Sequence, residues 1–225
     1  MTSASTSAVP VLTLDGPGGA GKGTVASAIA EIKGWHLLDS GALYRIIAVA
    51  ALRQGIPLDD ATALADLCPL LEIVFGVGWG KVSGDDFTDA IRTEDAGSIA
   101  SIVAELPPVR DAILTLQREF RKAPGLVADG RDMGTVVFPD ASVKIFLDAS
   151  AEARAERRYN QLKNKGLGVS FRVLLEQIQE RDARDRERAV APLRPAEDAL
   201  IVDSTQMTID EVVATVMAQL ASKAE

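Results

Sequence analysis

The stretch VPVLTLDGPGGAGKGT, at residues 9–24, constrains the fold of this chain more than any other. An apolar strand leads into a glycine-rich loop with a lysine, and a helix is expected to begin directly after it. Glycine lets the backbone approach an anion so closely that its N–H groups point inward, and a helix N-terminus favours negative charge. The spacing from Gly16 to Lys22 fits the P-loop pattern, except that Gly23 stands before Thr24. The stretch therefore predicts a phosphate-binding loop; a turn that only connects strand to helix is the alternative.

Composition limits the classes of protein that these 225 residues can form. No uncharged apolar run reaches the roughly 20 residues of a membrane span, so no membrane partner is expected. Residues 1–8 lack the features of a signal peptide and are interpreted as a disordered tail. The single cysteine, Cys68, cannot form an internal disulfide, which suits a core thiol in a cytoplasmic protein. The net charge of −8 argues against a nucleic-acid partner, and the absence of an obvious exposed apolar stripe predicts a monomer.

One segment departs from the acidic balance of the chain. Residues 151–194 contain 11 Lys and Arg against 7 Asp and Glu, and their pattern is helical. We expect this segment to concentrate positive charge around a small anionic ligand. Within it, positions 181, 184, 185 and 188 fall on one helical face, which would gather three guanidinium groups and one carboxylate. A solvent-exposed stripe of salt bridges is the alternative.

The rest of the chain alternates strands and helices, as an α/β protein with a parallel sheet does. Further strands are predicted at residues 35–38, 126–128, 143–147 and 200–202. Helices are predicted at residues 24–33, 42–52, 98–105 and 108–121, and after Thr208. Short alternating runs broken by glycines over residues 71–93 predict a small antiparallel hairpin inserted into this order. His36, the only histidine, is interpreted as a packed residue of its strand.

Two turns that follow strands offer further groups for an anion. The first, at residues 39–41, presents the Ser40 hydroxyl and free backbone N–H groups, with Arg45 one helical turn later. The second, DGRD at residues 129–132, lies at the end of a central strand, where open α/β sheets bind their ligands. An acid at that place is the usual partner of a P-loop and helps to orient Mg²⁺ or its waters. Phosphoryl transfer needs such positioning and positive charge rather than a Cys/His nucleophile pair, which this chain lacks.

With these motifs the chain resembles the bacterial cytidylate (CMP) kinases, within the nucleoside monophosphate kinases. The motifs that carry the resemblance lie between about residues 9 and 203 and are DGPGGAGKGT, HLLDSGALYR, IRT, SIVAELPPVR, ADGRDMGTVVFPDA, KIFLDA and ERDARDRERAVAPL. The resemblance implies transfer of the γ-phosphoryl group of ATP to CMP or dCMP, a step of pyrimidine metabolism, with Mg²⁺ accompanying ATP. It also implies a three-layer α/β fold with a parallel five-stranded sheet, a small antiparallel insert and a helical lid. The implied segments are the core at 9–70, 108–150 and 171–225, a CMP-binding insert at 71–107 and a lid at 151–170.

The same resemblance implies roles for individual residues. The ATP phosphates would be held by Gly16, Pro17, Gly18, Gly19, Ala20, Gly21, Lys22, Gly23 and Thr24. CMP would be bound by Ser40, Arg45, Ser101, Arg110, Arg131, Asp132, Arg181, Asp185 and Arg188. The catalytic charges would come from Lys22, Arg131, Arg158, Arg184 and Arg188. Because glycine replaces the usual hydroxyl residue after the P-loop lysine, no direct metal ligand is expected, and Asp129 or Asp132 would lie in the outer shell at most.

Two alternative functions stay open at this point. The first is a kinase for another nucleoside monophosphate, such as UMP or AMP, which would differ in the base pocket around Asp132. The second is a P-loop switch that binds a nucleotide in order to control a partner. A guanine-specific switch needs an Asn-Lys-x-Asp motif, and the nearest string, at residues 164–167, lacks the aspartate.

Overall fold

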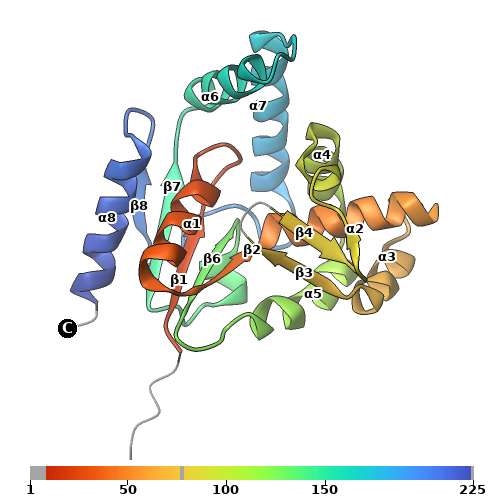
Figure 1. Ribbon diagram of the computed structural model, residues 1–225, viewed down its shortest axis with the longest axis horizontal. Coiled ribbons are helices and arrows are strands. Elements are labelled where there is room, and N and C mark those ends of the chain that lie inside the picture. The colour runs from red at the N-terminus through yellow and green to blue at the C-terminus, as the bar shows by residue number, and fades with distance from the viewer. Residues whose placement is uncertain (1–8, 77–78, 224–225) are drawn as a thin grey trace, which may run out of the picture.

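A five-stranded parallel sheet forms the centre of the computed structural model, which describes residues 9–76 and 79–223 (Figure 1). The strands follow the order β2–β6–β1–β7–β8, and each neighbouring pair is parallel. Their bounds are β1 (Val11–Asp15), β2 (His36–Asp39), β6 (Leu126–Gly130), β7 (Val143–Asp148) and β8 (Leu200–Asp203). The predicted sheet is therefore confirmed. The tail predicted at residues 1–8 lies outside the described residues.

Helices cover both faces of the sheet and give the molecule three layers (Figure 1). One apolar cluster joins Leu12 and Leu14 to two helices, α1 (Lys22–Lys33) and α8 (Ile209–Ser222). The opposite cluster joins Val11 to three helices, α2 (Ser40–Gln54), α3 (Ala61–Leu67) and α5 (Pro107–Glu119). Alternate residues of β1 thus enter opposite clusters, as the two-residue repeat of a strand requires. Within the described ranges, no helix has the length and apolarity that crossing a bilayer demands.

The segment predicted as an insert forms a small antiparallel sheet at one side of the molecule (Figure 1). Its strands are β3 (Ile73–Gly76), β4 (Trp79–Val82) and β5 (Asp85–Asp86). A 3₁₀ turn, η1 (Cys68–Leu70), precedes them, and η2 (Ala90–Arg92) and α4 (Glu94–Val103) follow. Because α4 packs against α2, the segment lies beside the turn that follows β2.

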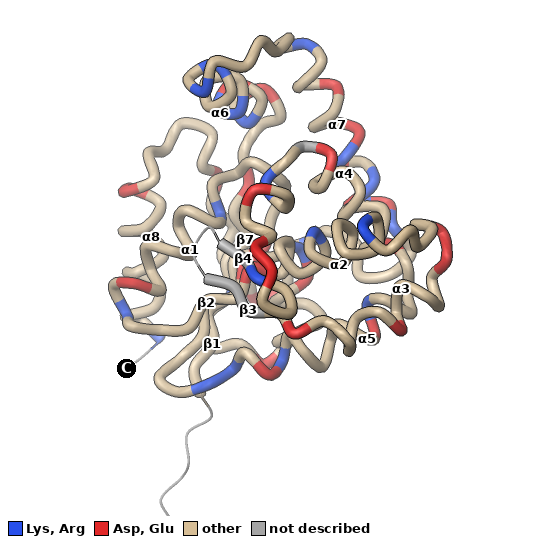
Figure 2. Tube along the Cα trace, turned by 45° about the vertical axis from the view of Figure 1, so that its right-hand side comes forward, with Lys and Arg blue, Asp and Glu red and all other residues tan. Residues whose placement is uncertain are grey.

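Two helices stand above the carboxyl end of β7 (Figure 1). They are α6 (Ala151–Asn164) and α7 (Phe171–Glu187), and they pack against each other. The Ser150 side chain caps α6 by accepting the N–H of Ala153 at 3.1 Å. Figure 2 shows several Lys and Arg residues gathered on α6. The predicted helical, positively charged segment is therefore placed over the edge of the sheet at which the P-loop lies.

The structure corrects the predicted starts of three helices. α2 begins at Ser40, two residues before the predicted start, because the Asp39 carboxylate caps it by accepting the N–H of Ala42 at 2.9 Å. α4 begins at Glu94, four residues before the predicted start, because the Thr93 hydroxyl caps it. α1 also begins two residues earlier than predicted, directly after the P-loop. For α2 and α4 the capping residue lies outside the apolar repeat from which the start was predicted.

The prediction for the single histidine was wrong, whereas that for the single cysteine is confirmed. His36 is exposed, because it opens β2, the strand at one edge of the sheet. Its Nε2 lies 3.0 Å from the carbonyl oxygen of Ala123 at the molecular surface. Cys68 is buried and its thiol donates to the carbonyl oxygen of Leu64.

Candidate active site

The loop between β1 and α1 has a shape that only glycine permits at several positions. Gly16, Gly19 and Gly21 have φ values of 145°, 80° and 97°. A Cβ atom on Gly16 would also collide with the carbonyl oxygen of Leu147 in β7, because the two backbones pass closely. The loop is therefore fixed in an open curve that ends at the N-terminus of α1, where unpaired N–H groups favour an anion.

Lys22, the first residue of α1, points its ammonium group into this curve. It is 5% exposed, and its Nζ donates to the carbonyl oxygen of Pro17 at 2.8 Å and lies 3.9 Å from Asp129 Oδ1. Burial lowers the pKa of Lys22 to about 7, and the nearby Arg131 acts in the same direction. Burial likewise raises the pKa of Asp129 to about 6, although the Lys22 ammonium opposes that rise. A phosphate arriving here would stabilise the charged form of the lysine.

A cavity of about 400 Å³ lies over the loop and collects cations from five parts of the chain, one of them Arg92 in η2. Beside Lys22 it is lined by Arg45 from α2, Arg131 from the turn after β6 and Arg181 from α7. Thr24, Asp39 and Asp129 add oxygen atoms, and the loop glycines add backbone N–H groups. Such a concentration of positive charge in a partly buried site suits a ligand with several phosphates.

A neighbouring cavity lined by eight of the nine residues predicted to bind CMP lies beside the first. They are Ser40, Ser101, Arg110, Arg131, Asp132, Arg181, Asp185 and Arg188, with Tyr44 on its wall. The ninth, Arg45, lines the cavity over the loop instead. Residues from α2, α4, α5, α7 and the turn after β6 therefore meet at one place.

Two carboxylates organise this second cavity. Asp132 forms an ion pair with Arg110, and Arg188 Nη2 lies 3.9 Å from its other oxygen. Asp185 accepts from Arg131 Nε at 2.9 Å and from the Ser101 hydroxyl at 3.1 Å. Although burial acts to raise it, Arg131 and Arg181 hold the pKa of Asp185 below its usual range. Both carboxylates are thus set to accept hydrogen bonds from a polar ligand.

Unsatisfied groups also line this cavity. Arg188 Nη2 and Arg181 Nε are buried and have no hydrogen-bond partner among the residues that the structure describes. Buried donors of this kind are rare, because leaving one unpaired costs about 1–3 kcal/mol. The cavity therefore has donors available for a ligand that carries acceptors.

The two remaining predicted arginines differ, because Arg158 lines a cavity that shares Gly18, Gly19 and Arg181 with the one over the loop, whereas Arg184 does not. Arg158 lines a third cavity, of about 380 Å³, together with Arg157 and Lys165 beneath the helices above the sheet. Arg184 lines none of these three cavities, and its Nε lies 3.7 Å from Glu105 Oε1. The predicted grouping of positions 181, 184, 185 and 188 therefore holds for three of them. Arg184 lies at the edge of the face of α7 that carries these residues, on the side nearest the end of α4. There its guanidinium is close to the carboxylate of Glu105.

Sequence reasoning missed the buried pair of Arg154 and Asp182. Arg154 is 2% exposed, and its guanidinium makes a two-pronged contact with the Asp182 carboxylate. Its Nη1 also donates to the carbonyl oxygen of Gly18 at 3.0 Å and its Nε to that of Ala149 at 2.9 Å. The pair thus ties α6, α7 and the P-loop together. The sequence signal that could have indicated a buried arginine was the position of Arg154 between two alanines in the first turn of α6.

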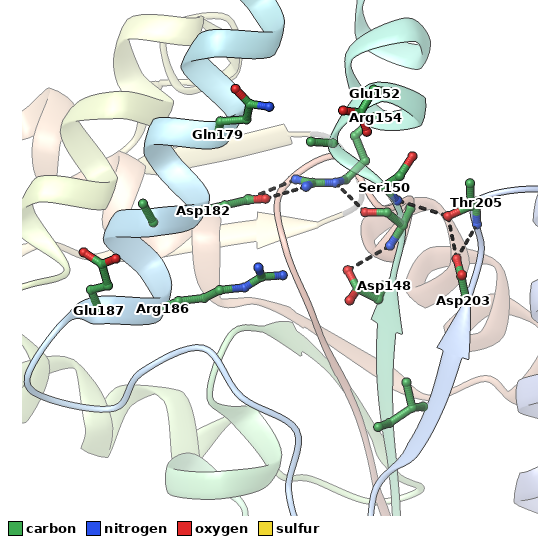
Figure 3. A pocket seen from close by; sticks show the side chains of 14 residues that line it. Asp148, Ser150, Glu152, Arg154, Gln179, Asp182, Arg186, Glu187, Asp203 and Thr205 are labelled. Carbon is green, nitrogen blue, oxygen red and sulfur yellow. Dashed lines mark hydrogen bonds and ion pairs between the residues drawn. The ribbon is translucent and has the colours of Figure 1, made fainter.

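A larger cavity, of about 820 Å³, borders the same pair but has the wrong charge for a nucleotide (Figure 3). Its wall has two guanidinium groups, from Arg154 and Arg186. Against these stand five carboxylates, from Asp148, Glu152, Asp182, Glu187 and Asp203. A polyanion would be repelled there, so charge rather than size identifies the candidate active site.

Comparisons with known proteins show what the whole chain is similar to. The chain matches the family described as cytidylate kinase over residues 12–222. The cytidylate kinase of Aeromonas salmonicida is 61% identical over 213 residues, which cover 93% of each chain. That of Aeromonas hydrophila is 60% identical over 213 residues, again 93% of each chain. A solved structure of an uncharacterized protein from Eubacterium ventriosum, 12% identical, covers 95% of this chain and 99% of that chain with a TM-score of 0.51, and supports the fold alone.

Proposed function

Because the chain belongs to the cytidylate kinase family, in which ATP phosphorylates CMP to CDP, we propose which of its residues bind each substrate and which act in the transfer. The chain is thus an ATP-dependent CMP kinase. The observation that carries the proposal is that two cavities, one over the P-loop and one around Asp132 and Asp185, share Arg131 and Arg181. Phosphoryl transfer requires donor and acceptor phosphates to meet in line. We assign ATP to the first cavity and the monophosphate to the second, so that the shared arginines lie between the two.

On the donor side, the loop from Gly16 to Thr24 holds the ATP phosphates through its N–H groups. Lys22 adds a cation that is worth most when charge develops on the transferring group, because the site is buried. Arg158 supplies further charge from α6 when the lid, residues 151–170, closes over the site and excludes water. We leave Arg184 outside the catalytic set, because it pairs with Glu105.

On the acceptor side, Ser40, Arg45 and Arg131 bind the phosphate of CMP. This phosphate is already ionised at neutral pH, since its second pKa is about 6, so the reaction needs no general base. The arginines instead neutralise the charge on the reacting oxygens.

We assign the base and the sugar to the same cavity, whose volume is about 50 Å³, so its side chains have to move apart to admit them. Asp132 accepts a hydrogen bond from the exocyclic amino group of cytosine, with Ser101, Arg110 and Arg188 around the ring. Asp185 and Arg181 bind the sugar. Because a carboxylate can accept from the 3′-hydroxyl that ribose and deoxyribose share, we include dCMP among the substrates. Transfer to dCMP gives dCDP.

The residues over the P-loop also fit Mg²⁺. Thr24, Asp39 and Asp129 present oxygen atoms to the cavity, and hard oxygen donors suit this ion. We place Asp129 in its outer shell rather than Asp132, because Asp132 is paired with Arg110 in the neighbouring cavity. When bound with ATP, Mg²⁺ neutralises charge on the phosphate oxygens. We propose that the enzyme is a monomer, and we place it in the cytoplasm.

ADP formation from Mg-ATP tests the proposal, with CMP, dCMP, UMP, AMP and GMP supplied as separate acceptors. We expect CMP and dCMP to give the highest kcat/KM, and a reaction without acceptor to give the background hydrolysis. If UMP or AMP exceeded CMP, the assignment of Asp132 to the base would be wrong. If ATP bound but no acceptor reacted, the chain would be acting as a P-loop switch.

A further inference from the structure

A buried amide on α5 holds the hydroxyl group with which α2 begins. Gln117 and Ser40 are both 3% exposed, and Gln117 Nε2 donates to Ser40 Oγ at 2.8 Å. Ser40 lines the cavity assigned to CMP, whereas Gln117 lies behind it and does not line that cavity. The amide therefore touches the cavity only through the serine.

This hydrogen bond restricts what the serine can do. A serine hydroxyl has one proton to donate and two lone pairs with which to accept. Because Gln117 donates to Ser40, one lone pair is occupied and the proton has to point away from the amide. Ser40 Oγ donates no hydrogen bond to any of the residues described, so its proton remains available to the cavity. A phosphate can only accept there, and a hydroxyl held as a donor matches it.

Without the amide, the same hydroxyl would be free to turn. A serine hydroxyl that is not held can rotate and form hydrogen bonds with nearby backbone groups instead, which would draw the proton away from the cavity. Because Gln117 fixes the Ser40 hydroxyl before CMP binds, backbone groups do not compete with the phosphate for its proton, and less side-chain entropy is lost on binding.

Other contacts of α5 also hold segments that carry residues of the CMP site. Arg118, next to Gln117, donates to the carbonyl oxygens of Val137 at 3.1 Å and Val136 at 3.3 Å. These belong to η3 (Met133–Val137), the π-helical turn directly after the DGRD motif. One end of α5 therefore supports both acceptor-side motifs, the one that begins with Ser40 and the one that carries Arg131.

We propose that Gln117 is a positioning residue for the phosphoryl acceptor, which fixes the Ser40 hydroxyl as a hydrogen-bond donor to the phosphate of CMP. The proposal rests on the role proposed above for Ser40. It predicts that changes at Gln117 act on CMP and not on ATP, and only while the serine is present.

The first test uses Gln117→Glu, which keeps the shape of the side chain and turns a donor into an acceptor. We expect the KM for CMP to rise roughly 10- to 100-fold at about pH 8, while the KM for ATP stays within about twofold. The ratio of variant to wild-type KM for CMP should fall towards about pH 6, because a protonated carboxyl group can donate again. Gln54→Glu, at an exposed position of α2, is the matched control and should leave both KM values unchanged. A ratio that does not change with pH, or equal effects on both substrates, would overturn the proposal.

The second test is a double-mutant cycle that also serves if Gln117→Glu does not fold. Ser40→Ala removes the hydroxyl, and Gln117→Leu removes the donor; thermal unfolding verifies each variant. Gln117→Leu should raise the KM for CMP in the wild-type background and add less than about twofold in the Ser40→Ala background. If Ser40→Ala leaves the KM for CMP unchanged, the role proposed for Ser40 fails. If Ser40→Ala raises it but Gln117→Leu has the same effect in both backgrounds, only the positioning role fails.

Discussion

Breaking the buried ion pair of Arg154 and Asp182 should destabilise the whole fold, because this pair joins three segments. Arg154→Met keeps most of the buried stem of the side chain but removes its guanidinium. The Asp182 carboxylate, 11% exposed, then loses its ion-pair partner, and the carbonyl oxygen of Ala149 loses its donor. Removing one partner of a buried pair typically costs about 3–5 kcal/mol. The carbonyl oxygen of Gly18 adds little, because Gly18 is half-buried and borders open cavities.

We therefore expect Arg154→Met to lower the free energy of unfolding by about 3 kcal/mol. Asp182→Leu should lower it by a similar amount, because the guanidinium is then the unpaired charge. The double variant leaves no lone charge, so its loss should be at least about 2 kcal/mol smaller than the sum of the single losses. This difference is the coupling free energy between Arg154 and Asp182, and it measures how much each charge stabilises the other in the folded protein.

Urea-induced unfolding followed by circular dichroism measures these free energies by linear extrapolation. Arg172→Met is the matched control on α7, because Arg172 pairs with Glu176 at 2.9 Å but is 86% exposed. Its loss should be about 0.5 kcal/mol or less. A coupling between Arg154 and Asp182 below about 1 kcal/mol would refute the reasoning, because it would mean that water screens this pair as it screens the exposed one.

Four further predictions concern the reaction. Lys22→Ala should lower kcat by roughly 100-fold or more with an unchanged circular dichroism spectrum, since the lost charge acts mainly in the transition state; normal turnover would disprove the P-loop assignment. Arg131→Met should raise the KM for CMP and lower kcat together, because Arg131 borders both cavities, and normal kinetics would reduce it to a structural residue. Asp132→Ala should lower kcat/KM for CMP roughly tenfold more than for UMP, which lacks the amino group; an intact preference would contradict the base assignment. The pKa of Lys22, about 7, should rise when ATP binds, because the phosphates stabilise the charged ammonium group. Calorimetry in buffers of different ionisation enthalpy should therefore detect proton uptake on ATP binding at about pH 8 and little at about pH 6. Proton uptake that did not change with pH would show that Lys22 is not the group that takes up the proton.

Local patterns were sufficient to predict the P-loop and the order of most strands and helices, although α3 was not predicted, and most residues of the second cavity came from the family resemblance. Glycines and a lysine between a strand and a helix allow few other structures, so the loop at Gly16 could be located before the fold was known. The DGRD motif was also placed correctly, because the carboxyl ends of parallel strands meet at one edge of the sheet. Helix starts were less accurate, because caps such as Asp39 and Thr93 lie outside the apolar repeat.

The tertiary structure alone decided which distant side chains meet. Arg154 finds Asp182 and Gln117 finds Ser40 only because of how helices pack, and no local pattern specifies partners 28 or 77 positions apart. Arg184 lies near Glu105 rather than in either substrate cavity, which depends on how α4 and α7 are placed. The sequence by itself therefore determined the phosphate-binding loop and the order of elements, since backbone conformation and apolar periodicity are local properties. Which charges are paired, and which stay available for a nucleotide, depends on contacts between segments that only the folded chain brings together.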